Sequence, residues 1–314
     1  MKKRWLLAGA VNLAAAGLAV LSFGVWKRLS PEQVDEQDAQ THMEGSIVSG
    51  FFDQNLDDVG FIPSANKRVT AKKMAGTQVI YDVVYTTGAD HFRAVPAAGH
   101  PERCILLFGD SFTFGAGVND DETSAAQIII KSKGKVTAKN LGVGGWGPHQ
   151  FLAGLQSGRF RRAITCTPTG AVYLLIPAQI ARAAGRSPWD THGPLYRLAA
   201  KAVRPVRAGN FDTNTEFSWR RIAGLNRLTE IEEAELSVAL IEEGGRDLKR
   251  QYPGIHFYVL AWPGISDEMR RRLGARPLEE ALRDFTQVAY QIPIDGHPNP
   301  RAHAGIADYI LSLP

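Results

Sequence analysis

Residues 105–117 constrain the fold of this chain more than any other stretch. Four apolar residues, Ile-Leu-Leu-Phe, run directly into Gly109-Asp110-Ser111, and glycine returns at positions 115 and 117. A short apolar run bounded by glycine is typical of a fully buried strand of a parallel sheet. Ligands of open parallel sheets bind beyond the carboxyl ends of the strands, where Ser111 would lie. A reactive serine is one interpretation of this residue, and a helix-capping serine is the other.

Short apolar runs alternate with helical periodicity from here to the end of the chain. We expect strands at 104–108, 136–143, 171–176 and 255–260, helices at 122–131, 148–163, 279–289 and 301–311, a long helix from 229, and a short strand at 290–294. This alternation predicts an α/β fold with a doubly wound parallel sheet over residues 101–314. Residues 184–226 interrupt the rhythm and are expected to be an insertion near the carboxyl ends of the strands.

The amino terminus has the pattern of a membrane segment. Three basic residues precede an uncharged run from Trp5 to Trp26, which Lys27 and Arg28 close. A spanning helix needs about 20 apolar residues, whereas the core of a signal peptide has about 7–15. Residues 1–28 are therefore expected to form a transmembrane anchor, with a cleaved signal segment as the alternative. The basic residues favour a body on the exported side, periplasmic or extracellular.

Two regions lie between this segment and the α/β domain. Residues 29–49 are expected to be a polar linker, and residues 50–100 a small β-rich element, because residues 78–86 are rich in β-branched and aromatic side chains. Basic residues are scattered and the net charge is only +4, so no nucleic-acid partner is expected. Cys104 and Cys166 have no metal-type spacing. Buried thiols are favoured over a bridge, although an export compartment would still permit a bridge. No metal and no cofactor are expected, since the glycines fit neither a dinucleotide fingerprint nor a phosphate-binding loop.

A serine nucleophile needs a base and a group that orients the base. His297 is the best candidate base, because Pro298 favours an extended conformation before it and places Asp295 on the same side of the chain. Asp295 could then hold one ring nitrogen while the other faces Ser111. A plain turn is the alternative interpretation of Asp-Gly-His-Pro.

Three segments together resemble, in order, the sequence blocks of the SGNH (GDSL-type) hydrolases. They are Gly109-Asp110-Ser111, Asn140-Leu141-Gly142-Val143-Gly144-Gly145 and Asp295-Gly296-His297. The resemblance covers about 105–311 and implies the flavodoxin-like SGNH hydrolase fold, with Ser111 as nucleophile, His297 as base and Asp295 as its partner. It also implies that the N–H groups of Ser111 and Gly145 form an oxyanion hole.

The chain departs from the family pattern at two places. The closing block is usually Asp-x-x-His and is one residue shorter here. The third block, Gly-x-Asn-Asp, is replaced by Ile176-Pro177-Ala178-Gln179, and Gln179 is expected to supply the amide of the missing asparagine. Losing one oxyanion donor would raise the barrier by about 2.7–4 kcal/mol.

The resemblance implies a serine ester hydrolase that acts on acyl esters, O-acetyl esters among them, of an envelope polysaccharide or lipid. An O-acyltransferase with the same triad is one alternative, and a non-catalytic module that binds a glycan or an envelope partner is another. Trp189 in the insertion is either a sugar-stacking platform or an anchor of the insertion. His149, His192 and His303 are weaker candidates for the site.

Overall fold

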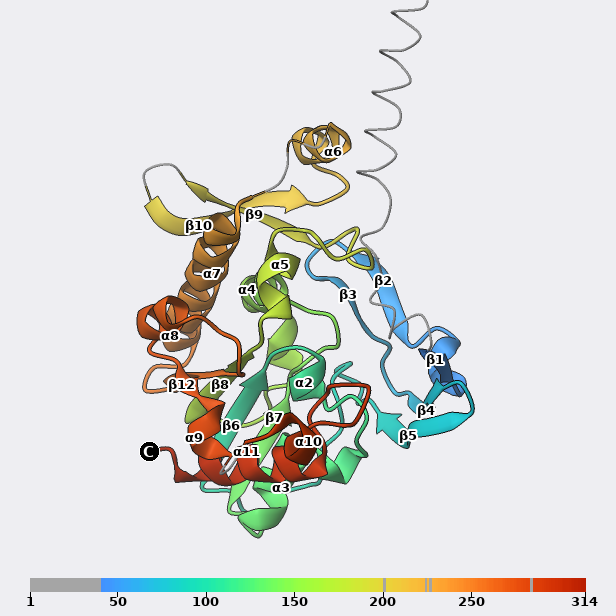
Figure 1. Cartoon of the computed structure of the whole chain (residues 1–314). Helices are drawn as coiled ribbons and strands as arrows, with labels where there is room; N and C mark the ends of the chain where they lie inside the picture. Colours follow the sequence, from blue (N-terminus) through green and yellow to red (C-terminus); the bar gives the residue numbers. More distant parts are fainter. Residues whose placement is uncertain (1–40, 200–201, 224, 226–227, 283–284) are drawn as a thin grey trace, which may run out of the picture.

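A five-stranded parallel sheet lies at the centre of the computed structural model, which describes residues 41–314 except 200–201, 224, 226–227 and 283–284 (Figure 1). The strand order is β12-β11-β8-β6-β7, and every pairing is parallel. The strands are β6 (Arg103–Phe108), β7 (Val136–Asn140), β8 (Gly170–Leu175), β11 (His256–Ala261) and β12 (Arg276–Pro277). After β6 the chain adds β7 on one side and all later strands on the other. The carboxyl end of β6 is therefore the switch point at which such sheets bind ligands.

Helices cover both faces of this sheet and divide the core into two apolar layers. One face carries α4 (Pro148–Ser157), α5 (Ala178–Ala183) and α7 (Glu230–Gln251), and the other carries α3 (Ser124–Lys131) and α11 (Pro300–Ser312). Successive residues of β6 serve opposite layers: Phe108 packs with Phe151 of α4, and Leu107 belongs to the layer of Ile306 of α11. Burial on both faces explains why β6 is a continuous apolar run.

The four main strands lie where they were expected, although β7 ends at Asn140 and not at 143. The segment 279–294, expected to be a helix and a short strand, was predicted wrongly. It contains α9 (Leu278–Ala281) and α10 (Gln287–Tyr290) instead of one helix, and its described residues form no strand but a single bridge between Gln291 and Pro298. Helix α9 ends because Leu282 takes an extended conformation and buries its side chain. Helix α8 (Asp267–Leu273) and the two-residue β12 were not predicted.

The amino-terminal β region, residues 41–86, packs beside the α/β domain (Figure 1). Strands β1 (Thr41–Glu44), β4 (Arg68–Ala75) and β5 (Gln78–Thr86) form an antiparallel sheet, and β2 (Phe52–Leu56) pairs with β3 (Gly60–Pro63). Strand β1 falls inside the residues expected as linker. The small core of the amino-terminal β region holds Phe51, Val69 and Tyr85, together with Phe114 from the α/β domain. This shared core joins the amino-terminal β region to the end of α2 (Ser111–Phe114).

Residues 184–226 contain an antiparallel hairpin and a short helix outside the central sheet. The hairpin is β9 (Pro194–Ala199) with β10 (Ala202–Asn210), and α6 (Thr215–Ile222) follows. The hairpin packs on α4 and α7. Among the described residues no helix is both long and apolar enough to span a bilayer. The expected anchor, residues 1–28, lies outside the described part of the chain.

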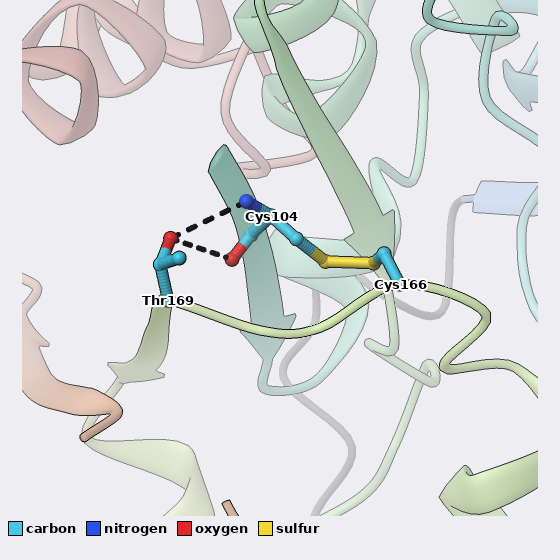
Figure 2. Close-up of a disulfide and its surroundings, with 3 residues drawn as sticks. All are labelled: Cys104, Cys166 and Thr169. Carbon is cyan, nitrogen blue, oxygen red and sulfur yellow. Dashed lines mark hydrogen bonds between the residues drawn. A yellow bond between two sulfur atoms is a disulfide. The ribbon is translucent and has the colours of Figure 1, made fainter. Parts of the chain in front are cut away.

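Cys104 and Cys166 form a disulfide, which corrects the expectation of two free thiols (Figure 2). Cys104 lies in β6, and Cys166 precedes β8. Thr169 also joins the starts of β6 and β8. Its Oγ1 accepts from the N–H of Cys104 at 3.3 Å and donates to the carbonyl of Cys104 at 3.2 Å. The cysteines are 62 residues apart in sequence, but β6 and β8 are parallel neighbours that start at the same edge of the sheet.

Candidate active site

Ser111 is the first residue of α2, directly beyond the switch-point strand β6. Asp110 caps this helix, because its Oδ1 accepts the N–H of Phe112 at 3.1 Å. Gly109 has a φ of +150°, and a Cβ there would lie 2.3 Å from Oγ1 of Thr113, so only glycine fits the turn. The turn therefore places the Ser111 hydroxyl beyond the edge of the sheet.

Ser111, His297 and Asp295 form one continuous chain of hydrogen bonds. Nε2 of His297 is 2.9 Å from Oγ of Ser111, and Nδ1 of His297 is 2.6 Å from Oδ1 of Asp295. The same carboxylate oxygen accepts the backbone N–H of His297 at 3.2 Å. Because a carboxylate accepts, Nδ1 carries the proton, and Nε2 is left to accept the proton of the Ser111 hydroxyl. This is the geometry required of a general base next to a serine nucleophile.

The turn before α11 orients Asp295 and His297. Gly296 has a φ of +82° and Ile294 a φ of +69°. The N–H of Ile292 donates to the carbonyl of His297 at 2.8 Å and closes the turn. A non-glycine residue in the left-handed region costs about 1–3 kcal/mol, so surrounding contacts must hold Ile294 in this conformation. The turn brings the carboxylate of Asp295 within hydrogen-bond distance of the His297 ring.

Asp295 is buried and ionised. Its side chain is 1% exposed, and Nζ of Lys73 donates to its Oδ2 at 2.8 Å. Burial raises the pKa of this carboxyl, but the hydrogen bonds and charges of His297 and Lys73 outweigh burial and lower the pKa from 3.8 to about 2. Asp295 therefore carries its full negative charge at neutral pH. Sequence reasoning missed Lys73, which lies in β4 and 222 residues from its partner.

The loop after β7 lies against the Ser111 turn. The N–H of Val143 donates to the carbonyl of Gly109 at 3.2 Å, and a Cβ on Gly142 would lie 2.6 Å from the nitrogen of Phe114. Gly145 follows with a φ of +86°. Among the hydrogen bonds of the described residues, none uses the backbone N–H of Ser111 or Gly145. Both donors remain available to a bound oxygen.

Gln179 is buried, and its side chain forms hydrogen bonds to the neighbouring strand β8. Its Oε1 accepts from the hydroxyl of Tyr173 at 2.9 Å, and its Nε2 donates to the carbonyl of Leu174 at 3.1 Å. None of its side-chain hydrogen bonds reaches the Ser111 turn. Arg182, three residues further along α5, does reach it: Nη1 donates to Oδ2 of the buried Asp110 at 2.6 Å. Sequence reasoning missed Arg182, although the helical spacing from Gln179 is a signal that could have found it.

Trp189 stands beside the loop that carries Gly145. The residue is 53% exposed, and its Nε1 lies 3.4 Å from the carbonyl oxygen of Gly145. The guanidinium of Arg182 lies 5.8 Å from the centre of the indole. The next residue, Asp190, is buried and accepts from Gln150 at 2.7 Å. A large, half-exposed aromatic face therefore borders the site on a firmly held segment.

The other three candidate histidines have partners away from Ser111. His149 pairs with Asp190 at 2.9 Å, and His192 pairs with Asp212 at 2.8 Å. Nδ1 of His303 lies 2.9 Å from the hydroxyl of Ser124. Burial, and then the charges of Arg93 and His297, lowers the pKa of His303 to about 3, so it is neutral. The structure thus brings only His297 to the serine among the described histidines.

No protein-family model and no curated protein matches this chain. It is similar to solved structures at low identity. An acetyl xylan esterase from the rumen bacterium Butyrivibrio proteoclasticus is 13% identical over 70% of this chain and 65% of that chain, with a TM-score of 0.38. A carbohydrate esterase family 2 enzyme of Myceliophthora fergusii is 15% identical over 72% of this chain and 68% of that chain, with a TM-score of 0.36. A lipolytic protein of the G-D-S-L family from Desulfitobacterium hafniense is 10% identical over 67% of this chain and 98% of that chain, with a TM-score of 0.38.

Proposed function

We propose that this protein is a serine esterase of SGNH type. The single observation that carries the proposal is the hydrogen-bonded chain of Ser111, His297 and Asp295 at the carboxyl end of the switch-point strand. Serine, imidazole and buried carboxylate in this order are the apparatus of acyl transfer. The N–H groups of Ser111 and Gly145, which have no partner among the hydrogen bonds of the described residues, would serve as the oxyanion donors.

The geometry supports a two-step mechanism. Oγ of Ser111 attacks the ester carbonyl carbon while Nε2 of His297 takes its proton, and the N–H groups of Ser111 and Gly145 hold the oxygen that becomes negative. The tetrahedral intermediate collapses, the C–O bond to the alcohol breaks, and His297 returns the proton to the leaving oxygen. Water then attacks the acyl-serine with His297 again as base, which releases the acid and restores Ser111.

The surroundings of the triad favour an acyl ester on a carbohydrate as the substrate class. Trp189 offers an exposed aromatic face next to Gly145, and such faces stack on the apolar side of sugar rings. A lipid ester is the competing substrate class. An O-acyltransferase would use the same acyl-serine with a sugar hydroxyl in place of water.

We further propose that the protein works outside the cytoplasm, held by an amino-terminal anchor. The Cys104–Cys166 disulfide supports an oxidising compartment. The uncharged run from Trp5 to Trp26, with basic residues on both sides, supports the anchor. Two separate experiments test these points. Carbonate extraction of cell membranes tests the anchor, and protease treatment of intact spheroplasts tests on which side of the membrane the body lies. Release by carbonate, or protection of the body from protease, would contradict them.

Ester hydrolysis by the full-length protein in detergent tests the serine mechanism. We expect release of p-nitrophenol from p-nitrophenyl acetate, labelling of Ser111 by a fluorophosphonate, and a loss of about 10³-fold or more in Ser111→Ala and His297→Ala. His192→Ala is the matched control, because His192 pairs with Asp212 outside the site. Equal rates in all four proteins with no labelling would refute the esterase and favour the non-catalytic module.

The substrate class is tested by comparing an acetylated xylo-oligosaccharide with p-nitrophenyl acetate. If the sugar stacks on Trp189, Trp189→Ala should raise KM for the oligosaccharide by about tenfold relative to the change for the small ester. Acetate that appears on an added oligosaccharide, instead of in solution, would identify the transferase. Faster cleavage of a long-chain acyl ester, with no effect of the substitution on sugar esters, would favour the lipid substrate.

A further inference from the structure

The amino-terminal β region contacts the Asp295–His297 dyad directly. Lys73 lies in β4, and its Nζ donates to Oδ2 of Asp295 at 2.8 Å, with 17% of the lysine side chain and 1% of the carboxylate side chain exposed. We propose that Lys73 is a positioning residue of the active site, so that the amino-terminal β region completes the machinery of the α/β domain. This inference rests on the proposed esterase function.

Lys73 uses the one carboxylate oxygen that the histidine leaves free. Oδ1 of Asp295 already accepts Nδ1–H and the backbone N–H of His297, at 2.6 Å and 3.2 Å. With Oδ2 held by Lys73, both oxygens are fixed and the carboxylate plane cannot rotate. Since Asp295 orients the imidazole, fixing its plane also fixes the direction in which Nε2 faces Ser111.

The lysine is itself held in place by a tight junction. Opposite Lys73 on β5 stands Tyr81, and the pairing of β4 with β5 shifts register between Lys73 and Met74. Such bulges re-aim a side chain. A Cβ on Gly117 would lie 3.1 Å from the Tyr81 ring and 2.3 Å from Ile292. Glycine at this position therefore lets β5 lie against the turn that carries Asp295 and His297. The N–H of Gly117 also donates to the hydroxyl of Tyr85 at 2.8 Å.

Lys73 also balances the charge of the dyad. The groups that face Asp295 are His297 on its own turn, Lys73 on β4, and the hydroxyls of Tyr81 and Tyr85 on β5. Burial raises the pKa of both tyrosines, so they are neutral, and Lys73 is the ion-pair partner of Asp295 on the side away from His297. Without Lys73, the buried carboxylate of Asp295 would lose this partner and its Oδ2 would be left without its hydrogen bond.

Steady-state kinetics of Lys73→Met in the full-length protein test the inference. The substitution keeps an unbranched apolar side chain, one heavy atom shorter, and removes the charge and the Nζ donor. We expect kcat for p-nitrophenyl acetate to fall by about tenfold or more, because a misdirected base is costly, with KM changed less than about twofold. Lys73→Arg should recover most of kcat, since it restores the cation.

Lys72→Met is the matched control, because the neighbouring lysine pairs with Glu44 on the other face of β4. It should leave kcat and KM as in the wild type. A wild-type kcat in Lys73→Met would overturn the inference. So would equal losses in Lys73→Met and Lys73→Arg with normal thermal unfolding, since charge would then play no part.

The low-field proton resonance of Nδ1–H of His297 separates this inference from the proposed function. It reports the hydrogen bond to Asp295 and needs no turnover. We expect Lys73→Met to shift or broaden it and Lys72→Met to leave it in place. If the wild type is inactive but Lys73→Met still changes the resonance, the esterase is refuted and the contact between Lys73 and Asp295 stands. If Lys73→Met leaves the resonance unchanged, only the positioning role of Lys73 is refuted.

Discussion

The Cys104–Cys166 disulfide should stabilise the protein mainly by restricting its unfolded chain. The bridge spans a sequence separation of 62 residues. Loop-closure entropy for a loop of that length corresponds to roughly 4 kcal/mol at 25 °C. The closed loop contains both Ser111 and the loop that ends in Gly145. Loss of the bridge should therefore lower the free energy of unfolding of the part of the fold that carries the proposed nucleophile.

Urea unfolding followed by tryptophan fluorescence measures this contribution. The wild-type protein should lose roughly 4 kcal/mol of unfolding free energy after reduction in denaturant and refolding with the thiols kept reduced. This comparison changes no atom of the core other than the bridge. Cys104→Ala/Cys166→Ala should lose about 1 kcal/mol more, because Cys104 is only 3% exposed and its buried sulfur is removed.

Cys166→Ala serves as the matched control, since one missing cysteine already prevents the bridge. It should match the reduced wild type, because Cys166 is only partly buried. A difference below about 1 kcal/mol between oxidised and reduced wild type would refute the reasoning. So would finding both thiols free by mass spectrometry in protein purified from an oxidising compartment.

Three further perturbations probe charge and packing around the site. Asp295 has a pKa of about 2 in the fold against an ordinary 3.8, so its ionisation stabilises the protein fully above about pH 4, and this stabilisation is lost as the pH falls toward 2. Between about pH 4 and pH 2, Asp295→Asn should lose less unfolding free energy than the wild type, as measured by urea unfolding at each pH. Arg182→Met should cost about 3 kcal/mol in urea unfolding, because it strands the buried carboxylate of Asp110, and adding Asp110→Asn should recover much of that cost. In Gly145→Ala, the Cβ would lie 2.7 Å from Nε1 of Trp189 and the φ of +86° is unfavourable for alanine, so the backbone N–H should move. We expect kcat for p-nitrophenyl acetate to fall by about 10²-fold, and an unchanged kcat would contradict a role of the Gly145 N–H.

The central sheet could be predicted from the sequence because its strands are buried on both faces. A continuous apolar run such as 171–176 is too short for a core helix and too apolar for a surface loop, so it indicates a buried strand. The two-residue β12 has no such run, and its pairing depends on β11. The segment 279–289 has helical periodicity, but burial of Leu282 in an extended conformation overrides local propensity there.

The proposed triad could be predicted because each residue lies at a recognisable place in the chain. Ser111 follows a strand, and Asp295 and His297 are two residues apart just before the last predicted helix. Lys73 could not be predicted, because nothing local distinguishes a lysine on a small strand that pairs with a distant carboxylate from one that faces water. The prediction of two free thiols was wrong for a related reason: the starts of β6 and β8 become neighbours only in the assembled sheet.

The buried side chain of Asp190 has a consequence for the thermodynamics of the sugar binding proposed at Trp189. Asp190 accepts from His149 and Gln150 of α4, so the segment that carries the indole is anchored to a helix of the core. A ring on a mobile loop would have to be ordered by its ligand, and that ordering costs about 0.5–1.5 kcal/mol for each immobilised side chain. At Trp189 that entropy has already been lost during folding. A ligand that stacks there therefore keeps more of its contact energy as affinity.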